Sequence, residues 1–172
     1  VEFLGGEPLL KTGLIDEICK ETNSRKFKYK LTTNGTVYDK KVVDVINNHS
    51  IGVRISIDGT AEMHDPWRRQ NKKPTHATIM KNAESFLMTL DSSPGIQITV
   101  HSGNVERLSE GIVYLYSQGF QNINLGIVQR GIVAKTYYEY LQQHKKLIHK
   151  LPDLPGLKLT PMMNTHYIPS VE

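Results

Sequence analysis

The sequence predicts an α/β protein, because short apolar segments typical of strands alternate with segments whose apolar residues recur at helical spacing. The strands are expected at residues 1–4, 27–32, 52–57, 96–101 and 122–128, and the helices at residues 11–22, 38–49, 75–90, 105–118 and 134–150. Strands that are joined through helices pair in parallel, by right-handed crossovers. The five units fit either an open doubly wound sheet or part of a larger barrel.

The later helices are recognised by their periodicity. Two of them have clear apolar faces, formed by Ile79, Ala83, Phe86, Leu87 and Leu90 in one and by Leu108, Ile112, Leu115 and Tyr116 in the next. Asn104 can cap the second of these helices and Gly119 can end it. The last helix is polar, with its helical spacing carried by Tyr138, Leu141, Lys145 and Ile148.

Two segments lack any such period. Residues 58–74 are expected to form a long polar loop, and a loop of that length at a ligand-binding edge is more often functional than idle. Residues 151–172 contain four prolines and are expected to be a linker or the start of a further element. The chain is therefore divided into a core, residues 1–150, and a tail, residues 151–172.

Composition excludes several classes of function. The 172 residues are 38% hydrophobic and 22% charged, with no apolar run of membrane-spanning length and no leader, so no membrane association and a cytoplasmic location are expected. The net charge of +4 is spread along the chain without interleaved aromatic residues, which excludes nucleic-acid binding. The seven histidines form no ligand pair, and the single cysteine, Cys19, supports neither a disulfide nor a metal site.

The first three strands each run into a tight loop that contains glycine and a polar residue. These loops are Gly5-Gly6-Glu7-Pro8, Thr32-Thr33-Asn34-Gly35-Thr36 and Asp58-Gly59-Thr60. If the strands are parallel neighbours, all three loops open on the same edge, where ligands bind in repeated β/α folds. The loops therefore predict one candidate site.

The chemistry of the loops favours a ligand with an amine and a carboxylate. Gly5 and Gly6 allow close approach to the backbone, and Glu7 places an acidic group there that suits a cation. Ser56 ends the third strand on the same face as Asp58, and its hydroxyl can donate to a ligand carboxylate. Arg68 or Arg69 can reach back and pair with the same carboxylate in a fork. An amino-acid moiety held across adjacent strand ends satisfies both features.

The loops also resemble a known family. The segments Phe3-Leu4-Gly5-Gly6-Glu7-Pro8-Leu9, Thr32-Thr33-Asn34-Gly35 and Ser56-Ile57-Asp58-Gly59, followed by His64-Asp65-Pro66-Trp67-Arg68, are similar to the radical S-adenosylmethionine (SAM) superfamily. The resemblance covers residues 1–130 and is greatest to the branch with a SPASM extension, the peptide maturases and anaerobic sulfatase-maturating enzymes. It implies a partial (β/α)6 TIM-like barrel, of which this chain would hold the second to sixth units.

The resemblance also implies roles for individual residues. Gly5, Gly6 and Glu7 would hold the amino group of the methionine moiety of SAM, and Ser56 and Arg68 would hold its carboxylate. The floor of the cofactor pocket would be formed by Thr33 and Asn34, and Asp58 belongs to the same cofactor-binding set while it pins the long loop together with His64.

The activity implied is reductive cleavage of SAM to a 5′-deoxyadenosyl radical, which abstracts hydrogen from a peptide or protein substrate. The electron would come from a donor such as flavodoxin or ferredoxin through a [4Fe–4S] cluster. Family members hold that cluster with three cysteines in a C-x-x-x-C-x-x-C motif, and one cysteine cannot supply three thiolates. We therefore expect the chain to be an internal segment of the enzyme, inactive alone, with no metal ligand of its own.

Two alternatives stay open. A radical SAM enzyme that acts on a small molecule has the same loops, because the residues that select substrate lie mostly outside this segment. A non-catalytic β/α domain that binds a nucleotide or an amino acid would have the strand-end site without ever having had a cluster. A cysteine triad just upstream of Val1 in the parent sequence would discriminate against the second alternative.

Overall fold

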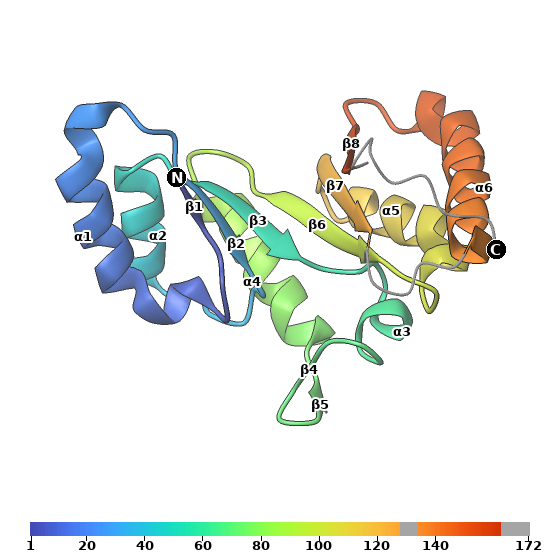
Figure 1. The fold of residues 1–172 in the computed structure, drawn as a ribbon, viewed down its shortest axis with the longest axis horizontal. Coiled ribbons are helices and arrows are strands. Elements are labelled where there is room, and N and C mark those ends of the chain that lie inside the picture. The colour runs from blue at the N-terminus through green and yellow to red at the C-terminus, as the bar shows by residue number, and fades with distance from the viewer. Residues whose placement is uncertain (128–133, 163–172) are drawn as a thin grey trace. The chain divides into compact units, whose positions relative to one another are not determined.

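The computed structural model describes residues 1–127 and 134–162 (Figure 1). The chain divides into two compact units, each described here by itself. Unit 1 comprises Val1–Ser56 and Thr75–Gly95, and unit 2 comprises Ile57–Pro74 and Ile96–Glu172. The five predicted strands and five predicted helices are all present, with ends that differ from the expected ones by at most three residues.

Unit 1 contains three parallel strands. They are β1 (Glu2–Phe3), β2 (Lys30–Thr33) and β3 (Gly52–Ser56), and in their register Phe3 lies opposite Leu31 and Leu31 opposite Val53. The helices of this unit are α1 (Thr12–Thr22), α2 (Lys40–Asn48) and α4 (His76–Thr89), with short 3-10 turns at Pro8–Lys11 and Asn23–Arg25. Parallel pairing follows from the helical connections, as the sequence predicts.

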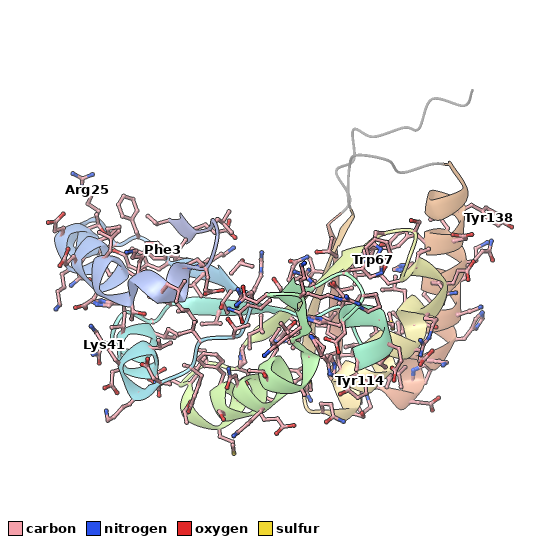
Figure 2. The ribbon with its side chains drawn as sticks, turned by 90° about the horizontal axis from the view of Figure 1, so that it is seen from below. Phe3, Arg25, Lys41, Trp67, Tyr114 and Tyr138 are labelled. Atoms are coloured by element: carbon pink, nitrogen blue, oxygen red, sulfur yellow. The ribbon has the colours of Figure 1, made fainter. Side chains whose placement is uncertain are left out.

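The core of unit 1 is built from the apolar faces that the sequence pattern indicates. Fully buried side chains come from β2, β3, α1 and α4, among them Leu31, Ile55, Cys19, Ala83 and Phe86. Cys19 is 0% exposed, so it acts as a small core hydrophobe. Figure 2 shows unit 1 with Arg25 and Lys41 labelled; the Arg25 side chain projects from the end of the 3-10 turn that follows α1.

Unit 2 contains the second set of parallel strands. They are β6 (Gly95–Val100), β7 (Asn122–Ile127) and β8 (Lys158–Met162), paired so that Ile98 lies opposite Leu125 and Ile123 opposite Leu159. Helices α5 (Leu108–Ser117) and α6 (Ala134–Lys150) pack against each other, with 3-10 turns at Val105–Arg107 and Leu151–Asp153 (Figure 1). Gly119 ends the α5 segment with a φ of 94°, as expected.

Residues 58–74 are more ordered than the long polar loop that the sequence predicts. They contain a short helix, α3 (Ala61–His64), and an antiparallel hairpin of β4 (Arg69–Gln70) and β5 (Lys73–Pro74). Asn71 and Lys72 form the turn with φ values of 51° and 64°, the backbone region of the tight turns that suit hairpin twist. Strands of two residues have no detectable period, which explains why the sequence pattern does not reveal them.

The tail also contains regular structure. Strand β8 lies within residues 151–172, the segment expected to be a linker or the start of a further element. The boundary between core and tail at residue 150 stays a prediction. In the described residues, no helix combines the length and apolar character needed to cross a bilayer.

Gly35 tests the packing of unit 1. Its φ is 75°, and a Cβ there would lie 2.7 Å from Ile79 Cγ2 and 2.8 Å from Ile55 Cγ2. We expect Gly35→Ala to reduce the free energy of unfolding by about 2–4 kcal/mol, through backbone strain and overpacking. The measurement is urea unfolding followed by circular dichroism.

Gly13→Ala is the matched control. Gly13 lies in α1, and the atom nearest to its added Cβ is Lys41 Nζ at 4.0 Å. Alanine in a helix is favoured over glycine, so this variant should gain about 0.5–1 kcal/mol. Equal losses in the two variants would show that the close contacts at Gly35 do not limit packing.

Candidate functional site

The carboxylate of Glu7 joins the loops that follow β1 and β2. Its Oε1 atom accepts hydrogen bonds from the Thr33 hydroxyl at 2.8 Å and from the backbone N–H of Leu9 at 3.0 Å. Its Oε2 atom accepts the backbone N–H of Asn34 at 2.7 Å. A carboxylate offers about four acceptor positions, so Glu7 can take a further donor at Oε2. We call Glu7, Thr33 and Asn34 the Glu7 cluster.

The Glu7 cluster is rigid because its members are themselves held. Thr33 is 1% exposed, and its hydroxyl also accepts the backbone N–H of Gly35 at 3.0 Å. The side-chain oxygen of Asn34 accepts both the backbone N–H and the hydroxyl of Thr36, at 2.9 and 2.7 Å. The sequence predicts that these residues gather at one edge, and within unit 1 the structure brings them together.

The two glycines beside Glu7 leave the backbone accessible. A Cβ added at Gly5 or Gly6 would meet no atom within 4 Å, and Gly5 has a φ of 119° that side chains rarely adopt. A hollow of about 350 Å³ opens next to them. Small-molecule sites have volumes of about 300–1,000 Å³, so the hollow lies near the lower end of that range. It is lined by Glu2, Phe3, Leu4, Gly5, Gly6, Glu7, Pro8, Lys11, Leu14, Ile15 and Ile18.

In unit 2, the buried carboxylate of Asp58 is paired with Arg68 in a fork, whereas the sequence predicts a fork between an arginine and the ligand carboxylate. Arg68 Nε lies 2.5 Å from Asp58 Oδ2, and Arg68 Nη2 lies 3.1 Å from Asp58 Oδ1. Asp58 Oδ1 also accepts the backbone N–H of Thr99 at 2.8 Å, and the Asp58 side chain is only 2% exposed. Arg69, the other arginine that could reach the ligand carboxylate, donates its Nε to the backbone carbonyl of Asp65 at 2.9 Å. The assignment of Arg68 to the ligand carboxylate stays a prediction.

The start of the 58–74 segment is held by two further contacts. The backbone N–H of Asp58 donates to His64 Nδ1 at 3.2 Å, which ties the strand exit to α3 as expected for a pinning role. Arg68 Nη2 also donates to the Thr99 hydroxyl at 2.9 Å. Asp58 and Thr99 thus engage Nε and Nη2 of Arg68.

The turn after β6 is held by the side chains of Asn104 and His101. The resemblance also implies that residues 100–104 lie near the adenosine of SAM, which stays a prediction. Asn104 is 1% exposed, and its side chain accepts the His101 N–H at 3.0 Å and donates to the Thr99 carbonyl at 2.8 Å. It therefore closes this turn, whereas the sequence suggests only a helix cap. His101 Nδ1 accepts the Gly103 N–H at 3.1 Å, and His101 Nε2 is buried without a hydrogen-bond partner among the described residues. The sequence signal that could have pointed to Asn104 and His101 is their position just after a predicted strand.

Ser56 ends β3 and is half-buried. Its assignment to the ligand carboxylate stays a prediction. Among the described residues, no group of three His, Cys, Asp or Glu side chains is arranged to hold a metal ion.

Comparisons of sequence identify two informative relatives. The chain is 30% identical over 161 residues to an uncharacterized protein of Methanocaldococcus jannaschii, which covers 90% of this chain and 56% of that protein. It is 35% identical over 88 residues to a cysteine-type anaerobic sulfatase-maturating enzyme of Clostridium novyi (strain NT), covering 46% of this chain and 23% of the enzyme. The chain therefore spans about half the length of the first relative and a quarter of the second. No family model matches the chain.

Solved structures share the fold. Native anSMEcpe with bound AdoMet and the Cp18Cys peptide superposes on 93% of this chain with a TM-score of 0.75 and 21% identity, over 49% of its own length. A domain of pyruvate-formate lyase-activating enzyme from Bacteroides vulgatus covers 95% of this chain and 98% of its own, with a TM-score of 0.60 and 18% identity. Streptococcus suis SuiB bound to S-adenosylmethionine covers 94% and 38%, with a TM-score of 0.66 and 16% identity. The resemblance to the radical SAM proteins of the maturase branch is confirmed.

Asp58→Asn tests the buried pair. The substitution keeps an oxygen that can accept from Thr99 but removes the charge that neutralises Arg68. We expect the free energy of unfolding to fall by about 2–4 kcal/mol, because a partner of a buried charge is lost. Glu110→Gln is the control, since its exposed pair with Arg107 should contribute less than about 1 kcal/mol. Similar losses in the two variants would contradict the special role of Asp58.

His101 gives unit 2 a defined pH dependence. Burial lowers the pKa of His101 below its ordinary value of 6.5, with Arg68 adding to the shift and Asp58 opposing it. The unfolded chain then takes up a proton at a higher pH than the folded chain, so stability should fall as the pH drops through about 6.5 and level off once the folded imidazole is protonated. Urea unfolding between neutral and mildly acidic pH measures this. The slope should flatten in His101→Gln but not in His149→Gln, which alters an exposed histidine of α6; equal slopes in the two variants would refute the assignment.

Proposed function

We propose that this chain is the core segment of a radical SAM enzyme that modifies a peptide or protein. In this proposal the five β-α units are the second to sixth of a (β/α)6 barrel, residues 1–150 form the barrel core, and residues 151–172 lead into a further extension. The cysteines that hold the [4Fe–4S] cluster belong to the parent polypeptide outside this chain. The segment by itself is inactive.

The Glu7 cluster is the observation that carries this proposal. An ammonium group is favoured where a carboxylate acceptor lies beside exposed backbone, and Glu7 has an acceptor position at Oε2 next to Gly5 and Gly6. Phosphates and other anions would be repelled by the same carboxylate. The methionine moiety of SAM has the ammonium group that this site suits, and SuiB and anSMEcpe, which share the fold, were solved with that ligand.

The other residues of the proposed site act through binding and positioning. Thr33 and Asn34 hold the Glu7 carboxylate in place by their hydrogen bonds, so that it needs no reorganisation when the amine arrives. Ser56 and Arg68 would bind the methionine carboxylate. Asp58 orients the Arg68 guanidinium through the fork and thereby acts as a positioning residue.

The cofactors supply the redox chemistry in this proposal. When bound, the cluster would supply the electron for reductive cleavage of SAM, the chemistry that leads to hydrogen abstraction from the substrate. The electron comes from a small donor protein such as flavodoxin or ferredoxin. A peptide substrate is supported by anSMEcpe, which was solved with a bound peptide.

Variants of the parent protein test the site. Glu7→Gln and Ser56→Ala should each weaken SAM binding about ten- to hundredfold, because each removes a charge-assisted hydrogen bond worth about 1.5–3 kcal/mol. Visible absorbance from the cluster should stay unchanged, since neither residue contacts it in the proposal. Isothermal titration calorimetry under anaerobic conditions measures the affinity.

Glu17→Gln serves as the charge-matched control. Glu17 is an exposed residue of α1, and its loss should leave SAM affinity as in the wild type. Wild-type affinity in both Glu7→Gln and Ser56→Ala would exclude the proposed binding mode, even if the parent protein carries a cluster.

A further inference from the structure

The hairpin of β4 and β5 is an exposed cluster of positive charge. Every residue from Arg69 to Pro74 is exposed, and Arg69, Lys72 and Lys73 are its cations. Residues 67–74 contain no aspartate or glutamate. We call residues 69–74 the basic hairpin.

The basic hairpin has a defined conformation. Arg69 pairs with Pro74 and Gln70 with Lys73, and the two-residue turn has positive φ angles at both positions. Its base is anchored by the Asp58–Arg68 fork and by the hydrogen bond from Arg69 Nε to the Asp65 carbonyl. The cations are therefore presented from a fixed ribbon, which lowers the entropy lost when a partner binds.

Trp67 precedes the hairpin, and its indole ring is packed on one part and exposed on another. Its side chain is labelled in Figure 2 and the residue is 59% exposed, although its ring centroid lies 4.4 Å from that of His101. A Cβ at Gly103 would lie 2.3 Å from the indole, so Gly103 provides the space in which the ring sits. Part of the indole is packed and the rest is open. Rigid, half-packed tryptophans are typical anchors of binding surfaces.

The lysines of the hairpin differ from two arginines of unit 2. Arg107 forms a fork with Glu110, and Arg68 is neutralised by Asp58. Lys72 and Lys73 have no ion pair among the described residues. The carboxylates nearest in sequence are Glu62 and Asp65, which precede Trp67. They leave residues 61–74 with an excess of cations.

We propose that Trp67 and the basic hairpin bind an acidic, extended segment of the peptide substrate. Its carboxylates pair with Arg69, Lys72 and Lys73, while one apolar side chain packs on the open part of the indole. The proposed surface consists of one tryptophan and a six-residue hairpin. An interface between globular proteins usually involves roughly 800 Å² and about 20–30 residues of each partner, so this surface is far smaller. This size favours a short peptide over a folded electron donor. The inference deepens the proposed function and rests on it for the identity of the peptide as substrate.

Trp67 itself reports binding, because it is the only tryptophan of the chain. The 172-residue protein is titrated with a blocked peptide of alternating glutamate and glycine that contains one leucine, and tryptophan emission is recorded. We expect a shift to shorter wavelength on binding, and about tenfold weaker binding of the peptide in which glutamine replaces every glutamate. Added salt should weaken only the glutamate peptide. Equal affinity for both peptides would overturn the proposal.

Charge reversal locates the surface. Lys72→Glu combined with Lys73→Glu should reduce affinity for the glutamate peptide about tenfold or more. Lys145→Glu combined with Lys146→Glu is the matched control, because it reverses another pair of adjacent exposed lysines in unit 2. The control should retain wild-type affinity within about twofold. Equal losses in the two double variants would show non-specific attraction and overturn the proposal.

Two further readouts separate this inference from the proposed function. The hairpin variant of the parent protein should bind SAM as the wild type does, because no residue of the hairpin belongs to the proposed SAM site. Loss of SAM binding in Glu7→Gln with unchanged peptide binding in the hairpin variant would retain the proposed function and reject the docking surface. Weaker binding of flavodoxin to the hairpin variant, without any change for the peptide, would likewise reject the peptide as occupant.

Discussion

The buried carboxylate of Asp58 constrains more of unit 2 than any other single group that we describe. An ionised carboxylate without partners in a protein interior costs several kcal/mol, so its neighbours must be placed to satisfy it. Arg68 and the backbone of Thr99 do so from separate segments, while the Asp58 N–H holds His64. Within unit 2, the carboxylate of Asp58 thereby joins the base of the hairpin to strand β6, and its backbone N–H ties the same residue to helix α3. Trp67 and the basic hairpin depend on this anchoring, because they flank Arg68 in the sequence.

In unit 1, the carboxylate of Glu7 likewise holds separate segments together by hydrogen bonds. A carboxylate placed after a short strand accepts backbone and hydroxyl donors from the next loop, and this fixes two strand ends to each other. Glu7 differs from Asp58 in being half-buried and in having an acceptor position left at Oε2. Asp58 is buried and both of its carboxylate oxygens have hydrogen-bond donors, which suits a residue that positions another side chain. Glu7 is partly exposed, which suits contact with a ligand. The different burial of two similar side chains therefore supports different roles in the proposed SAM site.

Much of the fold follows from the sequence because its signals are local. The spacing of Ile79, Ala83 and Phe86 predicts α4, and all three are buried as expected. The fork between Asp58 and Arg68 differs from the sequence prediction, in which an arginine binds the ligand carboxylate. The basic hairpin and β8 were not predictable, because two-residue strands and a strand with a proline show no alternation. The fit of Trp67 over Gly103 joins segments far apart in the chain, and no local pattern encodes it.

The production of 5′-deoxyadenosine by the parent protein tests the central claim most directly. The parent is purified without oxygen, its iron–sulfur content is reconstituted, and SAM is added with a strong one-electron reductant. A radical SAM enzyme forms 5′-deoxyadenosine under these conditions, and Glu7→Gln should reduce its formation. A parent that binds no iron–sulfur cluster and forms no 5′-deoxyadenosine would contradict the assignment and favour a β/α domain that binds its ligand without catalysis.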